Sequence, residues 1–230
     1  MGLTIERVRR FGGVAGILFV ILALVAFFLP GEPPKADDSA SEITKYFTDK
    51  RDDILASDYV LGLALTSFLL FLGSLRTHFG AGDRDGIRPG SIALAGGVAG
   101  TALILAGAAV FNGAVFRTGE AADASLNVAL YDVGNALFFM SGFGFAVFFI
   151  GAALAVRATG ALHAALAPAA LVAALLQLVS GTGLFVESGF FAAGGAFGSI
   201  AVLAAILWTL AASVALLRAR TVTGTASPAA

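Results

Sequence analysis

The chain has 230 residues, of which 58% are hydrophobic and only 13% are charged. Charged residues make up about 25% of a typical soluble domain, so this chain has too few of them to cover a water-facing surface. The mean hydropathy of +0.92 also excludes a disordered chain, because disordered chains are poor in apolar residues. The composition therefore predicts an integral membrane protein.

Several kinds of chemistry are excluded by the residues that the chain lacks. It has no Cys, which excludes disulfides, iron–sulfur clusters and thiol catalysis. Its two histidines, His78 and His163, lie outside the long apolar runs, which argues against a haem held between membrane histidines. A net charge of −1 gives no case for nucleic acid as a partner. We therefore expect no cofactor and no metal.

Six segments are long and apolar enough to cross a bilayer, which requires about 20 residues of helix. They cover approximately residues 11–29, 54–75, 91–116, 127–156, 162–186 and 194–217. The first segment is also open to interpretation as a signal peptide, but it exceeds the apolar length of about 7–15 residues that signals have. We predict an all-α fold, a polytopic membrane helix bundle of six transmembrane helices that forms a single domain over residues 1–220.

The distribution of basic residues predicts the orientation of the spans, because Lys and Arg in short loops mark the cytoplasmic side. The termini and the second and fourth connections hold nine of these residues: Arg7, Arg9, Arg10, Arg76, Arg84, Arg88, Arg157, Arg218 and Arg220. The other side holds five: Lys35, Lys45, Lys50, Arg51 and Arg117. We therefore expect both termini to be cytoplasmic.

The longest connection, residues 30–53, is predicted to lie on the outer side and to contain a short helix. Three prolines at its start exclude a helix there. Ser39 and Glu42 then have the spacing of a capping box, and apolar residues follow at helical spacing. We expect an amphipathic helix from Ser41 to about Arg51, which either covers the end of the bundle or acts as a lid over an outer cavity. Residues 221–230 are predicted to form a disordered tail.

Two short patterns recur along the chain. The sequence Gly-Gly-Val-Ala-Gly occurs at residues 12–16 and again at 96–100, and Tyr-x-x-Gly-x-Ala-Leu begins at both Tyr59 and Tyr131. These matches are expected either from three parallel helical hairpins or from chance in a chain rich in Ala and Gly. The small-xxx-small pairs let helices approach closely, and we expect them to serve packing within the bundle.

Polar residues inside membrane spans are costly, so we treat them as candidate functional residues. One interpretation is an outward-facing polar pocket for a ligand or an ion, with Asp132 at its centre and Arg117 as the counter-ion. The candidate set is Asp132, Asn135, Asn112, Arg117, Tyr131, Asp58, Tyr59 and Glu187, and Gln177 and Ser180 lie deeper in the fifth span. In the structural alternative, Asp132 caps its helix, and the acids near other span ends are solvated.

Some segments resemble a known group of proteins. These are Leu72-Gly-Ser-Leu-Arg76, the stretch from Tyr131 to Val147, Tyr46-Phe-Thr-Asp-Lys-Arg51 and Ile54-Leu-Ala. They are similar to segments of small, uncharacterised multi-spanning membrane proteins of actinobacteria, over approximately residues 30–157. The resemblance implies a location in a bacterial plasma membrane, and it implies no activity.

The chain contains no P-loop, zinc-protease or nucleophile-elbow motif. We therefore favour a non-catalytic role as an accessory, assembly or lipid-contacting membrane subunit, with membrane lipid and other membrane proteins as its partners. One alternative is a small-molecule or ion transporter or receptor that uses the pocket around Asp132. Another is an intramembrane enzyme that acts on lipids or isoprenoids.

Overall fold

The computed structural model describes residues 5–80, 88–116 and 123–219. Its spanning helices are α1 (Ile5–Phe28), α3 (Arg51–Gly80), α4 (Pro89–Phe116), α5 (Ala124–Thr159), α6 (Leu166–Ser180) and α7 (Ala196–Arg218). A short 3-10 helix, η1 (Gly181–Phe185), extends α6. The described residues contain no strand, and six helices are long and apolar enough to span a membrane. The predicted all-α bundle of six spans is therefore confirmed. Arg117 and the predicted tail lie outside the described residues.

Helix is the expected state for such segments, because lipid offers the backbone no hydrogen-bonding partners. Several hydroxyl side chains inside the spans follow the same logic by donating to carbonyl groups of their own helix. Thr209 donates to Ala205, and Ser213 donates to Thr209, at 2.9 and 2.7 Å. These side chains therefore add no exposed polar surface to the spans.

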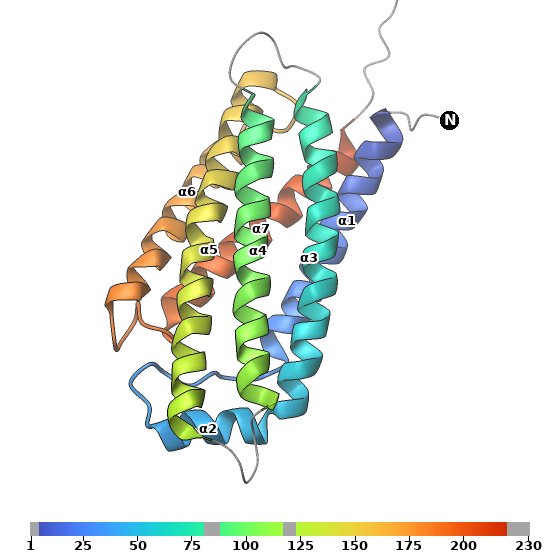
Figure 1. The fold of residues 1–230 in the computed structure, drawn as a ribbon. Helices are drawn as coiled ribbons and strands as arrows, with labels where there is room; N and C mark the ends of the chain where they lie inside the picture. Colours follow the sequence, from blue (N-terminus) through green and yellow to red (C-terminus); the bar gives the residue numbers. More distant parts are fainter. Residues whose placement is uncertain (1–4, 81–87, 117–122, 220–230) are drawn as a thin grey trace, which may run out of the picture.

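The predicted amphipathic helix is present as α2 (Ala40–Asp49), which begins one residue before the expected position. The Ser39 side chain accepts a hydrogen bond from the Glu42 backbone, and the Glu42 side chain accepts one from the Ser39 backbone. This capping box confirms the spacing argument. Ile43 and Phe47 are only 2% and 1% exposed, and α2 lies across one end of the bundle (Figure 1). We refer to this end as the α2 end.

The six spanning helices form a closed ring. Each packs against the next in the order α1, α3, α4, α5, α6 and α7, and α7 packs against α1. The start of α1 and the end of α7 lie together at the end opposite α2, which we call the terminal end (Figure 1). Helix α7 runs obliquely behind the other helices, from the α6 side at the α2 end towards the start of α1 at the terminal end.

Glycines make the closest helix contacts, as the small-xxx-small patterns predict. A Cβ atom on Gly96 of α4 would lie 2.4 Å from the backbone nitrogen of Phe148, and one on Gly144 of α5 would lie 2.5 Å from that of Gly100. A Cβ atom on Gly16 of α1 would lie 1.9 Å from the Ser213 hydroxyl oxygen of α7. Both copies of the glycine pattern therefore lie in packed helix interfaces.

The two tyrosine-led patterns lie in different surroundings. Tyr59 is 71% exposed, whereas Tyr131 is 2% exposed and packs beneath α2. A Cβ atom on Gly62 would meet nothing within 4 Å, whereas one on Gly134 would clash with the ring of Phe111. The similar sequences therefore do not correspond to similar packing, and a repeat of three hairpins remains a prediction.

Aromatic side chains fill the ring towards the terminal end. Phe68 and Phe71 from α3, Phe148 from α5 and Trp208 from α7 belong to one buried cluster. The ring of Phe148 lies 5.6 Å from that of Phe68 and 5.5 Å from that of Trp208. The Trp208 indole also donates to the carbonyl oxygen of Leu166 at 2.9 Å, which satisfies its only polar atom. This half of the bundle is therefore closed.

Candidate ligand cavity

The ring is hollow towards the α2 end, where it encloses a cavity of about 1410 Å³. Side chains from all six spanning helices, α1, α3, α4, α5, α6 and α7, form its wall, and the aromatic cluster, through Phe68 and Phe148, forms its floor. Tyr46 and Phe47 of α2 cover part of the opposite side. Protein interiors are normally packed with few voids, so a cavity of this size is the main candidate for a binding site.

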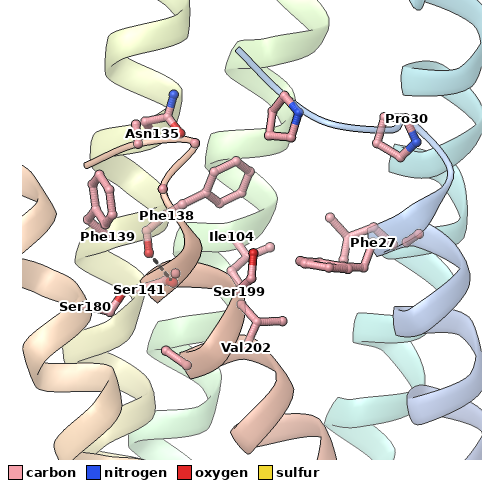
Figure 2. Close-up of a pocket in the computed structure, with 18 of the residues that line it drawn as sticks. Phe27, Pro30, Ile104, Asn135, Phe138, Phe139, Ser141, Ser180, Ser199 and Val202 are labelled. Atoms are coloured by element: carbon pink, nitrogen blue, oxygen red, sulfur yellow. Dashed lines mark hydrogen bonds between the residues drawn. The ribbon is translucent and has the colours of Figure 1, made fainter. Parts of the chain in front are cut away.

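The oblique course of α7 explains why the cavity exists. Near the terminal end, α7 touches α1 where Ser213 meets Gly16, and contact continues as far as Val20 and Ile206. Beyond this point the two helices line opposite sides of open space, as Phe27 on α1 and Val202 on α7 show in Figure 2. The divergence of the two helices therefore opens the cavity.

The cavity reaches the outer surface of the bundle between α1 and α7. Phe28 and Val202 both line it, and yet they are 66% and 40% exposed to the surroundings of the protein. The cavity is therefore not fully enclosed by the bundle.

Two connections hold the α2 end of the cavity in place. The backbone of Ala36 donates to the carbonyl oxygen of Ala193 at 3.2 Å, and the Tyr131 hydroxyl donates to the carbonyl oxygen of Pro34. Gly194 has a φ of +73°, and a Cβ atom there would lie 2.5 Å from the Pro34 carbonyl oxygen. The connection after α1 and the connection before α7 are therefore fixed to each other.

Most of the cavity wall is apolar. It includes Phe19, Ala23, Phe27, Leu61, Leu65, Ile104, Phe138, Phe139, Phe145, Val202 and Ala205. Several polar side chains on the wall donate to nearby backbone carbonyl groups: Ser57 to Ala26, Ser141 to Phe138 and Gln177 to Ala201, at 2.7, 2.6 and 3.0 Å. These hydrogens are not available to a ligand. The cavity thus suits a mainly hydrophobic molecule.

Among the polar side chains on the cavity wall, Asp58 has a carboxyl oxygen whose hydrogen-bonding capacity is not satisfied. Its Oδ2 atom is buried and has no hydrogen-bond partner. The side chain of Asn112 on α4 forms a hydrogen bond with the Asp58 carboxyl group, but Oδ2 of Asp58 and Oδ1 of Asn112 both stay without a partner. Buried polar atoms without partners are rare and costly in proteins. This pair of residues is therefore a candidate for contact with a ligand.

The hydroxyl group of Tyr46 lies on the same side of the cavity. Burial raises the pKa of Tyr46 to about 12, and the nearby carboxylates of Asp58 and Asp53 contribute in the same direction. The phenol therefore keeps its proton at neutral pH. Tyr46 can then donate one hydrogen bond towards the cavity.

The structure brings together some of the candidate site residues. Asp58, Tyr131 and Asn135 all line the cavity, and Asn112 lies next to Asp58. Asn135 donates to the carbonyl oxygen of Tyr131 at 2.9 Å. Gln177 and Ser180 of α6 line the cavity as well. These side chains come from four helices and meet at the cavity wall, and their role in binding a ligand or an ion stays a prediction.

Other candidate residues lie apart from the cavity. Asp132, Tyr59 and Glu187 are exposed on the outside of the bundle and do not line it. Asp132 also does not cap its helix, because α5 begins at Ala124 and its cap is Asp123. The capping alternative for Asp132 is therefore wrong.

Some cavity residues carried no signal in the sequence. Phe27, Ser199 and Val202 line the gap between α1 and α7, but they look like ordinary residues of apolar helices. Comparison with known proteins adds no assignment, since no family model, curated protein or solved structure matches the chain.

Proposed function

We propose that the chain is an integral membrane protein that binds one lipid-like molecule in the cavity and does not alter it chemically. The observation that carries this proposal is the apolar cavity of about 1410 Å³, which α1 and α7 line on opposite sides. An acyl or isoprenoid chain in the bilayer can enter such a cavity without crossing water. Burial of its methylene groups against protein then gains packing contacts that an empty wall lacks.

The closed half of the bundle fits a protein that binds its ligand in place better than it fits a transporter. The cavity ends at Phe68 and Phe148, and the space beyond is filled by the aromatic cluster. Passage to the terminal end would require this buried cluster to separate. We therefore place a lipid-contacting accessory protein first and a small-molecule transporter second.

The location and orientation belong to the same proposal. Among the described residues, Arg7, Arg9 and Arg10 stand at the start of α1, Arg76 and Arg88 flank the next connection at the terminal end, and Arg218 ends α7. This bias supports a cytoplasmic terminal end, in the plasma membrane of a bacterium. The cavity then opens in the outer leaflet.

Native mass spectrometry of the full chain, released from a membrane in mild neutral detergent, tests the proposal. The wild type is compared with Ser199→Phe, which fills the cavity from α7 (Figure 2). Ile200→Phe is the matched control, because the neighbouring Ile200 is 43% exposed on the outside of the same helix. We expect one bound lipid-like molecule on the wild type and on Ile200→Phe, and its loss from Ser199→Phe.

Two results would overturn the proposal. One is a wild-type protein that carries no small molecule and takes none up when membrane lipid extract is added. The other is equal occupancy of all three proteins, which would place the molecule on the outside of the bundle. A covalently changed molecule released on incubation would instead support the enzyme alternative.

A further inference from the structure

The cavity has a polar end and an apolar end. All of its charged lining residues, Glu32, Lys35, Asp37 and Asp58, lie in the connection after α1 or near the start of α3, at the α2 end. The floor consists of aromatic rings such as Phe68 and Phe148. If the cavity holds a lipid-like molecule, as the proposed function states, its polar head group lies next to α2 and its chain extends towards the floor.

The charges at the polar end favour a positive head group. Three carboxyl groups and one lysine line the cavity, which gives a formal balance of −2. Lys50, which lies close by, is paired with Asp53 at 3.2 Å. An anionic head group would therefore meet an excess of like charge, whereas a cation would meet the complementary field.

The hydrogen-bond inventory points in the same direction. The hydroxyl hydrogens of Ser57 and Ser141 and one of the two amide hydrogens of both Gln177 and Asn135 are donated to backbone carbonyl groups. What these side chains still offer is mainly lone pairs on oxygen. A head group rich in hydrogen-bond donors matches such a wall, and a phosphate or carboxylate does not.

Asp58 supplies the specific partner. Its Oδ2 atom has no hydrogen-bond partner, and a carboxyl oxygen left unpaired in apolar surroundings is costly. Asp58 itself lines the cavity, and the terminal torsion of an aspartate is broad. A cation bound there would satisfy this oxygen.

Aromatic rings surround the same place. Tyr46, Phe47, Phe111 and Tyr131 all line the cavity. The rings of Phe111 and Tyr131 are stacked at 5.8 Å, and the ring of Phe47 lies 5.9 Å from that of Phe111. Ring faces attract cations, and aromatic groups combined with a carboxylate are a known way to recognise ammonium groups.

We infer that the cavity selects an amphiphile with an ammonium head group, which pairs with Asp58 among these aromatic rings while its chain lies against the apolar wall. The inference depends on the geometry of the wall and on the unpaired carboxyl oxygen. It names the ligand class of the proposed site and rests on that proposal.

A set of three probes with one common tail tests the head group. Oleylamine, oleyl alcohol and oleyl phosphate are added together, in equal amounts, to the full chain in neutral detergent at neutral pH. The bound species are counted by native mass spectrometry. We expect occupancy by the amine to exceed occupancy by the phosphate by about tenfold or more, the effect of one charged hydrogen-bonded pair, with the alcohol between them.

Two conservative variants locate the preference. Asp58→Asn should remove the preference for the amine and keep binding of the alcohol. Asp132→Asn is the matched control, because Asp132 is a carboxylate on a spanning helix that lies outside the cavity, and it should leave the preference unchanged. If Asp58→Asn does not fold, the competition among the three probes on the wild type still decides the head-group class.

The outcomes separate the two proposals. Absence of binding of all three probes would overturn the proposed function and this inference together. Equal binding of the three, or tighter binding of the phosphate, would overturn the inference alone and leave a lipid-binding role in place. Loss of the preference in Asp132→Asn, with retention in Asp58→Asn, would also overturn it.

Discussion

The two halves of the helix ring use similar residues in opposite ways. At the terminal end, Phe71, Phe148 and Trp208 interlock in the middle of the ring. At the α2 end, side chains such as Phe27 and Phe138 line a cavity of about 1410 Å³. Phenylalanine content therefore does not decide which half is solid. The separation of the helices decides it.

Glycine contacts set this separation. At the terminal end, Gly13 and Gly16 bring α1 close to Leu217 and Ser213 of α7. Near the α2 end, α1 and α7 no longer touch, and Val202 faces open space. One tight crossing between inclined helices thus produces both a closed half and an open half. Stability and binding are expected to reside in different halves of the molecule.

The largest predicted effect is on stability. Removal of a buried ring in the closed half should cost more free energy of unfolding than removal of a ring on the cavity wall. Phe71 is completely buried and packs on Phe68, so Phe71→Ala is expected to lower the free energy of unfolding by about 3–5 kcal/mol. Phe27→Ala removes a ring that already borders open space, and we expect a loss of less than about half as much. Unfolding by sodium dodecyl sulfate, followed by Trp208 fluorescence, measures both. Equal losses would show that the cavity half is packed as tightly as the other.

A smaller effect, with opposite signs, should come from adding one methyl group at two glycines. A Cβ atom on Gly144 would lie 2.5 Å from the backbone nitrogen of Gly100, so Gly144→Ala is expected to cost about 1–3 kcal/mol. A Cβ atom on Gly62 would meet nothing within 4 Å, so Gly62→Ala is expected to stabilise the helix by about 0.5–1 kcal/mol. Thermal unfolding in detergent compares them, and a stabilising Gly144→Ala would disprove the tight α4–α5 interface.

The sequence was sufficient to predict features that depend on neighbouring residues. Six apolar runs of sufficient length predicted the spans, and the spacing of Ser39 and Glu42 predicted the start of α2. Both depend on local chemistry, namely the thickness of a bilayer and the unpaired amides of a helix start. For the same reason, the glycine pairs at 12–16 and 96–100 were correctly predicted to lie in helix interfaces.

The cavity depends on how helices are rotated and inclined, which the sequence does not reveal. Asp58 and Asp132 look alike as acids near span ends, but Asp58 lines the cavity and Asp132 is exposed outside it. When a helix is apolar on all sides, its hydrophobicity shows little periodicity, so the sequence does not indicate which face points inward. The start of α5 at Ala124 rather than at Asn127 also moved Asp132 away from the helix end.

The smallest predicted effect concerns the helix that covers the open half. Hydrogen bonds from the Ser39 side chain and backbone lower the pKa of Glu42 from its ordinary value of 4.5. Because the pKa is lowered in the folded state, the ionised carboxylate stabilises the α2 cap at neutral pH. This contribution is lost as the pH falls below 4.5 and through the folded-state pKa. Hydrogen exchange of the first amides of α2 should therefore speed up in acid, relative to the intrinsic rate.

A matched pair of variants separates this cap from the other acidic cap in the chain. Glu42→Gln should remove the acid-induced loosening of α2 without affecting the start of α5. At α5, Ser125 and Leu126 donate to the carboxylate of Asp123 and lower its pKa. Asp123→Asn should have the reverse pattern, with altered exchange at α5 and unchanged pH dependence at α2. If hydrogen exchange at the start of α2 still speeds up in acid in Glu42→Gln, the ionised capping box does not stabilise α2. The buried side chains of Ile43 and Phe47 then keep α2 in place on their own.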